Sequence, residues 1–376
     1  MFDATETALF SDLPTNTGRQ IEMDIAKSLA ILAMVFVHVL LFIPNGVDTE
    51  SAYGLIVGFF GGVPAAPVFM FCMGVGMVYS RHSQFASLFR RGLRLLFLAY
   101  LLNFLRGTLP LTVLSPWIDA DAPFFQGESL RMKWLSMLFA VDILHFAGLT
   151  FLFFAIVRYF KLNKASLFVV GLALALVELL IVPHTTKSTV MNEFIGLFFR
   201  VDRNSAFPFF SWIPFPIAGY LFGGLLRKCR NKNSFYAFLL AAGSLLFILF
   251  TVTALKYQVP LGMRDDDVYY AQDFYRVLWG VSFILPWLSL LYFLSFCIPE
   301  GFLPDTIKRW SRNVNGIYMV HWVIIGWLVA VGFCVPLPKF STIAIAAVSL
   351  GILLASDFLV STYAHWKQPA TDATKG

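Results

Sequence analysis

Long runs of apolar residues, separated by short polar stretches, recur from one end of the chain to the other. A transmembrane helix needs about 20 consecutive, mostly apolar residues. Ten segments approach or meet that length: 24–44, 55–79, 92–108, 134–157, 166–182, 209–226, 235–255, 276–297, 314–332 and 342–362. The pattern predicts an all-α integral membrane protein, built as a bundle of about ten transmembrane helices.

The apolar segments follow one another without a long hydrophilic interval, so we expect one polytopic membrane domain over residues 21–364. Residues 1–20 and 365–376 are more polar and are predicted to form short cytosolic tails. The first tail lacks the basic stretch that opens a signal peptide. Such a multi-pass protein is expected in the cytoplasmic (inner) membrane of a bacterium.

Lys and Arg are concentrated in the connections that an N-in, C-in topology places in the cytosol. These connections include residues 81–94, 158–164, 227–232 and 308–312, and such a bias sets the orientation of membrane proteins. The topology therefore accounts for the formal net charge of +6. Because no basic stretch is interleaved with aromatic residues, we expect no nucleic-acid partner.

Composition and cysteine spacing narrow the class further. Hydrophobic residues make up 58% of the chain and charged residues 13%, about half the charged fraction of an ordinary globular domain. A lipid bilayer is thus the expected surrounding. The four cysteines form no CxxC pair and have no metal-ligand spacing, so we expect neither a metal site nor a structural disulfide.

Ionisable side chains within the first predicted span are candidates for function, because charges inside a membrane are costly. Asp24 precedes Lys27 by nearly one turn and can pair with it. His38 follows Lys27 by eleven residues, about three turns or 16 Å, so both side chains lie on one helix face. Two plainer interpretations stay open: Lys27 could snorkel to the interface, and His38 could be a satisfied interhelical contact.

The fourth and ninth spans add further polar positions. Asp142 is expected at a depth similar to that of His38, where it could orient the imidazole as carboxylates orient general bases. His145 shares the face of Asp142 as a cavity-lining residue, although the two could simply satisfy each other. In the ninth span, Asn315, Tyr318 and His321 form a polar stripe that suits a cytosol-facing cavity or a helix–helix contact.

The basic connection after the second span contains Arg91 and Arg94, which are one turn apart. Two guanidinium groups at this spacing can bind phosphates. The same arginines are also expected at a cytosolic boundary for topological reasons alone.

The opening of the chain resembles that of the transmembrane acyltransferase superfamily, which includes the acyltransferase-3 proteins and relatives of heparan-α-glucosaminide N-acetyltransferase. Arg19, Asp24, Lys27 and His38 match the order and the ten-residue gap of that opening. Segments PVFMFCMGVGMVYS, RRGLRLL, VDILHFAGL, FPFFSWIPFPIAGYLFGGLL and GIYMVHW match later landmarks in kind. The Arg-Gly usual after the aspartate is replaced by Lys27 and Ser28.

The resemblance implies a cytosolic acyl-CoA donor that is a co-substrate, with no permanently bound cofactor. Donor binding is then assigned to the residues Asp24, Lys27, Arg91, Arg94, Tyr318 and His321, and catalysis to His38 as general base with Asp142. The expected reaction moves an acyl group, acetyl being the first candidate, to a hydroxyl or amine of an extracytoplasmic carbohydrate or lipid-linked acceptor.

A transporter or flippase for a lipid-linked or anionic solute is the competing interpretation. The intramembrane Asp and His residues would then form a proton relay. The sequence has no evident inverted repeat and few proline-interrupted helix pairs, which are the usual signs of a secondary transporter.

Overall fold

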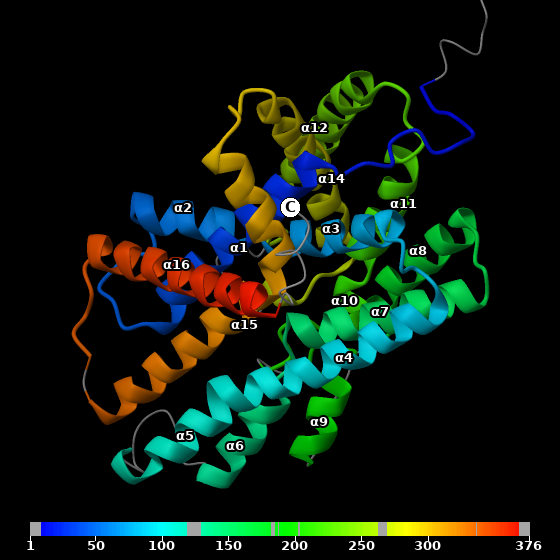
Figure 1. The fold of residues 1–376 in the computed structure, drawn as a ribbon. Coiled ribbons are helices and arrows are strands. Elements are labelled where there is room, and N and C mark those ends of the chain that lie inside the picture. The colour runs from blue at the N-terminus through cyan, green and yellow to red at the C-terminus, as the bar shows by residue number, and fades with distance from the viewer. Residues whose placement is uncertain are drawn as a thin grey trace, which may run out of the picture.

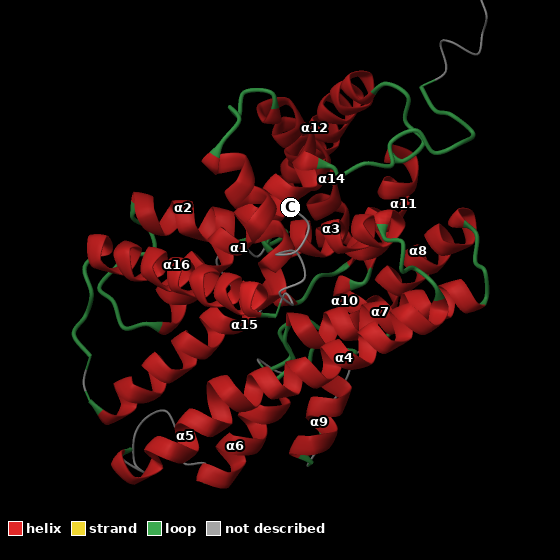
Figure 2. Ribbon diagram, in the orientation of Figure 1, coloured by secondary structure: helices red, strands yellow, loops and turns green. Residues whose placement is uncertain are grey.

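The computed structural model describes residues 9–118, 129–181, 185–186, 188–201, 204–261, 269–335 and 337–367. Within these residues all regular elements are helices (Figure 2), which confirms the predicted all-α class. The predicted tails lie partly outside the described residues, namely at 1–8 and 368–376.

The described helices are arranged as Figure 1 shows. Their bounds are α1 Ile21–Phe42, α2 Ala52–Gly61, α3 Ala66–Tyr79, α4 Phe85–Asn103, a π-helical turn η1 Phe104–Thr108, α5 Leu109–Leu114, η2 Ser115–Trp117, α6 Leu130–Phe139, α7 Ile143–Tyr159, α8 Lys164–Leu180, α9 Thr189–Gly196, α10 Phe209–Trp212, α11 Pro214–Leu226, α12 Lys232–Lys256, α14 Phe274–Ser295, α15 Phe302–Cys334 and α16 Thr342–Trp366.

Eight helical segments among the described residues are long and apolar enough to cross a membrane. They correspond to the predicted spans except for 134–157 and 166–182, whose counterparts α7 and α8 are shorter apolar helices. The chain is therefore a multi-pass membrane protein with at least these eight candidate spans. The short helices α5, α6 and α9 gather at one end of the molecule (Figure 1).

Two predicted spans are interrupted in the structure. Segment 134–157 was expected to be continuous, but α6 ends at Phe139 and Asp142 adopts an extended conformation as the N-cap of α7. Segment 55–79 is divided between α2 and α3, because Gly62 leaves helical geometry and the sequence VPAAP follows it. A proline restricts the residue before it to extended conformations, so a continuous helix is disfavoured there.

Two glycines allow helices α3 and α11 to approach each other at backbone distance. A Cβ on Gly74 of α3 would lie 2.0 Å from the carbonyl oxygen of Pro216, and one on Gly219 of α11 would lie 2.0 Å from that of Phe71. Small residues at such crossings let membrane helices pack closely. The α3–α11 pair thus forms a rigid wall beside the central helix α1, which packs against α2, α3, α14, α15 and α16.

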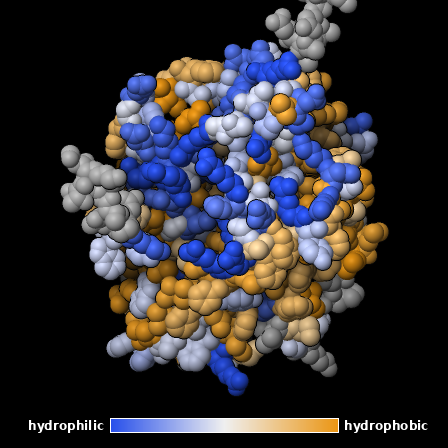
Figure 3. Space-filling view, turned by 45° about the vertical axis from the view of Figure 1, so that its right-hand side comes forward, coloured by the Kyte–Doolittle hydropathy of each residue, from blue (hydrophilic) through white to orange (hydrophobic). Residues whose placement is uncertain are grey.

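The outer surface suits contact with lipid. Helix α12 packs along α14 and leaves most of its large apolar side chains exposed. Figure 3 shows hydrophobic residues over much of the lower part of one face, with hydrophilic residues gathered in its upper and middle part. Such an exposed apolar surface would be unstable in water but matches hydrocarbon.

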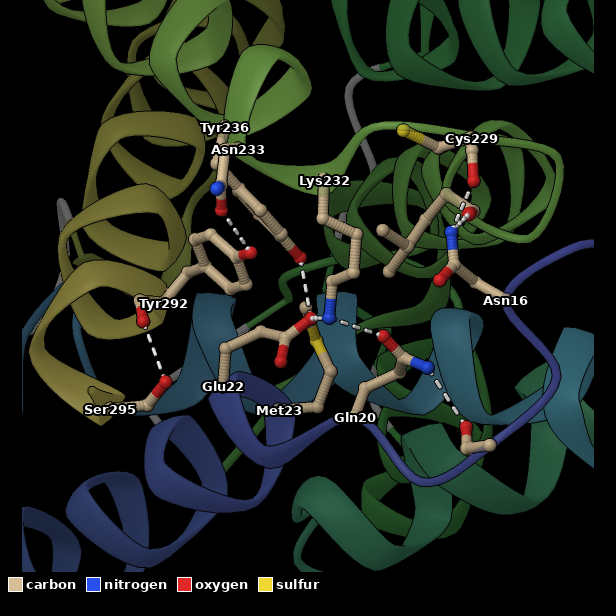
Figure 4. Close-up of polar contacts among 12 residues, drawn as sticks. Asn16, Gln20, Glu22, Met23, Cys229, Lys232, Asn233, Tyr236, Tyr292 and Ser295 are labelled. Carbon is tan, nitrogen blue, oxygen red and sulfur yellow. Dashed lines mark hydrogen bonds and ion pairs between the residues drawn. The ribbon is translucent and has the colours of Figure 1, made fainter. Parts of the chain in front are cut away.

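A buried ion pair fixes the beginning of α1 against α12 (Figure 4). The carboxylate of Glu22 is fully buried, and its Oε1 atom accepts from Lys232 Nζ at 2.8 Å and from Tyr236 Oη at 2.8 Å. Lys232 also donates to Gln20 Oε1 at 2.7 Å. A charge in this apolar setting is tolerable because it has both a counter-charge and hydrogen-bond donors.

Lys232→Met should destabilise the protein by about 3–5 kcal/mol, because Glu22 would remain buried without its counter-charge. The double variant Lys232→Met with Glu22→Gln should recover part of the loss. Thermal unfolding of the purified protein measures both effects, with Lys256→Met, an exposed lysine on the same helix, as control. Equal melting temperatures for Lys232→Met and the control would show that the pair contributes little.

Candidate active site

Two histidines from different helices meet at the centre of the bundle. His38 Nδ1, on α1, lies 3.0 Å from His321 Nε2, on α15. The two rings are nearly coplanar, with an interplanar angle of 2°. The contact joins the first and ninth predicted spans and makes His321 a partner of His38, whereas the sequence assigned it to donor binding.

Backbone geometry determines which nitrogen of each ring carries a proton. His321 Nδ1 lies 3.1 Å from the carbonyl oxygen of Ile317, which can only accept, so Nδ1 is the protonated nitrogen of His321. In a neutral ring, His321 Nε2 then accepts, and His38 Nδ1 must donate. The remaining nitrogen of His38, Nε2, carries a lone pair and makes no hydrogen bond with any described residue.

An aromatic ring and a cation complete the surroundings of His38. Trp322 packs on the His38 ring with a centroid distance of 4.3 Å. The guanidinium of Arg106 lies over the Trp322 ring, 4.5 Å from its centroid. Such stacking places a positive charge near the imidazole without a direct bond between them.

Asp142 holds this arginine. Arg106 Nη1 lies 2.7 Å from Asp142 Oδ2, and Tyr318 Oη donates to Asp142 Oδ1 at 2.6 Å. The amide of Ile143 donates to the same oxygen. The expected contact between Asp142 and His38 is therefore replaced by bonds to Arg106 and Tyr318, because Asp142 caps α7 and its side chain follows the cap direction.

A π-helical turn carries Arg106 into this position. Residues Phe104–Thr108 form the turn between α4 and α5, and such insertions are frequent at functional sites. Gly326 of α15 lies against it, since a Cβ there would be 2.0 Å from the carbonyl oxygen of Arg106. Arg106 Nη2 also donates to Asn103 Oδ1 at 2.9 Å, so the guanidinium is held from three sides.

Three cavities surround these residues. The first, here called the Arg106 cavity, has a volume of about 760 Å³ and is lined by His38, Arg106, Asp142 and Trp322. Ser136, Arg200 and Asn204 also line it and add hydrogen-bonding groups to a largely apolar wall. The second, the α2 cavity, has a volume of about 530 Å³ and also reaches His38.

The third cavity, here called the Arg91 cavity, has a volume of about 260 Å³ and contains a cluster of cations. Lys27, Arg91 and Arg312 line it, together with Asn315 and Tyr318. Tyr318 also lines the α2 cavity and is bonded to Asp142 in the Arg106 cavity. This tyrosine thus stands between the cationic cavity and the two cavities that meet at His38.

Asp24 fixes the helices around the Arg91 cavity. It pairs with Arg19, lies 3.4 Å from Lys27 Nζ, and accepts from Ser311 Oγ of α15 at 2.5 Å. The predicted Asp24–Lys27 pair is therefore present. Its carboxylate ties α1 to α15, while Lys27 extends to the cavity wall.

Of the remaining predicted site residues, Arg91 lines a cavity, whereas Arg94 and His145 do not. Arg91 lines the cationic cavity and packs on Phe151 at 4.3 Å, whereas Arg94 is not part of the lining. His145 is fully buried, accepts from the amide of Asp142, and packs edge-on against Tyr100. It thus belongs to the capping box of α7 and not to a cavity wall. This matches the alternative interpretation that Asp142 and His145, three residues apart, satisfy each other.

Sequence reasoning missed Arg106 and Trp322. A signal for Arg106 was available, because it is an ionisable residue inside the predicted span 92–108 and such residues are functional candidates. Trp322 appeared only as the last residue of the segment GIYMVHW and was given no role, since aromatic residues are common throughout this chain. Among the described residues no group of three or more His, Cys, Asp or Glu side chains is arranged to hold a metal ion.

The geometry defines a membrane-embedded site in which His38, held by His321, lines two cavities, and Tyr318 separates these from a cationic cavity. The chain belongs to the acyltransferase-3 family of membrane acyltransferases, since the family model described as "Acyltransferase domain" matches residues 20–359. Neither a curated protein nor a solved structure gives a match. The resemblance noted from the first helix is thereby confirmed, and the activity is that of a membrane acyltransferase.

Gly326→Ala should displace Arg106, because the added methyl group would overlap a carbonyl oxygen that belongs to the π-turn and cannot rotate away. Overpacking of this kind costs about 1–3 kcal/mol. A lower melting temperature is expected, with Gly351→Ala as control, since a Cβ at Gly351 of α16 meets no atom within 4 Å. Equal stability of the two variants would contradict the close approach of α15 to the turn.

Proposed function

We propose that the protein transfers an acyl group from an acyl-CoA bound at the Arg91 cavity to a hydroxyl or amine bound in the Arg106 cavity. The observation that carries this proposal is that His38 lines both cavities with its Nε2 unbonded while its Nδ1 is held by His321. A histidine with one nitrogen fixed and the other free is the arrangement of a general base.

In the proposed reaction the acceptor oxygen or nitrogen attacks the carbonyl carbon of the donor thioester, and His38 Nε2 takes the acceptor proton. The bond from carbon to sulfur then breaks, and His38 returns the proton to the leaving thiolate. The products are an ester or amide and free CoA. While His38 is positively charged, its Nδ1–H donates to neutral His321, which stabilises the charge without proton transfer.

The donor assignment rests on charge and position. Lys27, Arg91 and Arg312 converge on the Arg91 cavity, and cations of this kind bind the phosphates of a nucleotide. With the N-in topology expected from the distribution of Lys and Arg, this cavity opens to the cytosol, where acyl-CoA is found. In this proposal Arg94 contributes to the local positive potential without touching the donor.

The acceptor assignment rests on polarity and size. The Arg106 cavity has the volume of a pocket for a drug-sized ligand, roughly 300–1,000 Å³. Its wall combines an apolar aromatic side with hydrogen-bonding groups from Ser136, Arg200 and Asn204. A carbohydrate unit of an extracytoplasmic glycan or lipid-linked saccharide fits that chemistry, and a bacterial inner membrane would present it from the opposite side to the donor.

Arg91→Ala should weaken binding of acetyl-CoA to the purified protein by about 10- to 100-fold, the range that follows from losing a hydrogen bond to a charged group. Arg94→Ala should weaken it several-fold less, because that side chain is outside the cavity. Titration of each variant with acetyl-CoA provides the measurement. Arg90→Ala is the matched control, since Arg90 is exposed on the same helix and bonds to the carbonyl of Ala86.

The donor site would be supported by saturable binding of acetyl-CoA to wild type, together with a much larger loss of affinity in Arg91→Ala than in Arg94→Ala or Arg90→Ala. Equal losses for all three arginines would mean that net charge, and not the cavity, attracts the donor. Failure of the folded wild type to bind any acyl-CoA would overturn the proposal.

His38→Ala should lower acyl transfer by a factor of about 10² to 10⁴, as expected when a general base is removed, while acetyl-CoA binding stays unchanged. His321→Ala should reduce the rate less, because it leaves the base in place but unoriented. Release of CoA thiol in membranes that contain the natural acceptor gives the rate. A proton-coupled transporter would instead show unchanged thiol release and altered pH dependence of solute uptake.

A further inference from the structure

The α2 cavity differs in chemistry from its two neighbours. Small residues form much of its wall, including Gly54, Gly58, Gly61, Gly62 and Ala65. No lysine or arginine lines it, and the acidic residue there is Glu50. A glycine-lined wall without a lysine or arginine has no cation to bind phosphate, and the carboxylate of Glu50 would repel one.

The position of the α2 cavity is as informative as its lining. It shares Ile143 and Tyr318 with the Arg91 cavity. It shares His38 and Phe207 with the Arg106 cavity. The α2 cavity thus adjoins the Arg91 cavity through Ile143 and Tyr318, and the Arg106 cavity through His38 and Phe207.

We infer that the α2 cavity holds the acyl chain of the donor and that the protein accepts chains longer than acetyl. This inference rests on the proposed function, because it places the thioester carbonyl at His38. With the phosphates at Arg91 and the acceptor in the Arg106 cavity, the α2 cavity is the one of these three that reaches the base and has no cation in its lining. Its volume of about 530 Å³ is many times that of a two-carbon acetyl group.

Glycine at position 58 keeps this space open. A Cβ on Gly58 would meet no atom within 4 Å, so the wall at this position faces empty volume. A helix interior normally disfavours glycine relative to residues with a side chain. Glycine at position 58 of α2 therefore gives up helix stability and leaves room that a side chain would fill.

The test is a series of binding titrations with CoA, acetyl-CoA, butanoyl-CoA and hexanoyl-CoA, performed without any acceptor. Gly58→Leu projects a side chain into the cavity and should fold, because the position is open and leucine favours helix. Gly351→Leu is the matched control, since Gly351 is also helical, also has no atom within 4 Å of its Cβ, and lies on α16 away from the three cavities.

Each buried methylene strengthens binding by up to roughly fourfold. In wild type and Gly351→Leu, hexanoyl-CoA should therefore bind at least about tenfold more tightly than acetyl-CoA. In Gly58→Leu that ratio should fall to within about threefold, while binding of CoA and acetyl-CoA is unchanged. Because no acceptor is present, a chain-length effect reports on the donor alone.

Two results would overturn the inference while leaving the proposed function intact: equal binding of acetyl-CoA and hexanoyl-CoA by wild type, or an unchanged ratio in Gly58→Leu. The first would leave the cavity to another apolar group, such as the lipid of a lipid-linked acceptor. Absence of binding by CoA and every acyl-CoA to folded wild type would instead remove the proposed function itself.

Discussion

The hydrogen bond from His321 Nδ1 to the carbonyl of Ile317 determines the tautomers of His321 and of its partner His38. That carbonyl lies one helical turn before His321 on α15, so its position is fixed by the helix itself. Because it can only accept, it leaves His321 Nε2 as an acceptor and makes His38 Nδ1 a donor. The lone pair of His38 is thereby directed to its other nitrogen. In an apolar interior, where an unpaired polar group is costly, alternative tautomers would each leave an acceptor facing an acceptor.

A second constraint acts on Arg106, whose charge must be paired inside the bundle. Two departures from regular helix, the π-turn at 104–108 and the break before α7, make the pairing possible, and the close contact at Gly326 holds the turn against α15. Asp142 can reach the arginine because it is an N-cap with extended backbone, and not a member of a continuous helix. The charged part of the site therefore depends on irregular backbone, whereas the histidine pair depends on regular helices.

This difference explains what could be predicted from the sequence. Helix existence, the Asp24–Lys27 pair and the shared face of Lys27 and His38 all follow from local spacing, which a helix preserves. The break at Asp142 was missed because hydropathy continues across it. The π-turn that carries Arg106 was missed for the same reason, although the charge of Arg106 inside a predicted span was a signal in itself. The contact of His38 with His321 joins residues 283 positions apart, and no local pattern determines which of two nearby polar side chains, Asp142 or His321, will face His38.

Tyr318 connects the two parts of the site. It lines the cationic cavity and the α2 cavity, and its hydroxyl donates to Asp142. In the proposed reaction the thioester must pass this side chain to reach His38. Release of the tyrosine costs a hydrogen bond to a charged acceptor, about 1.5–3 kcal/mol, while Asp142 keeps Arg106 and the amide of Ile143. The carboxylate therefore stays paired when the passage opens, so admission of the donor need not disturb the arginine that faces the acceptor.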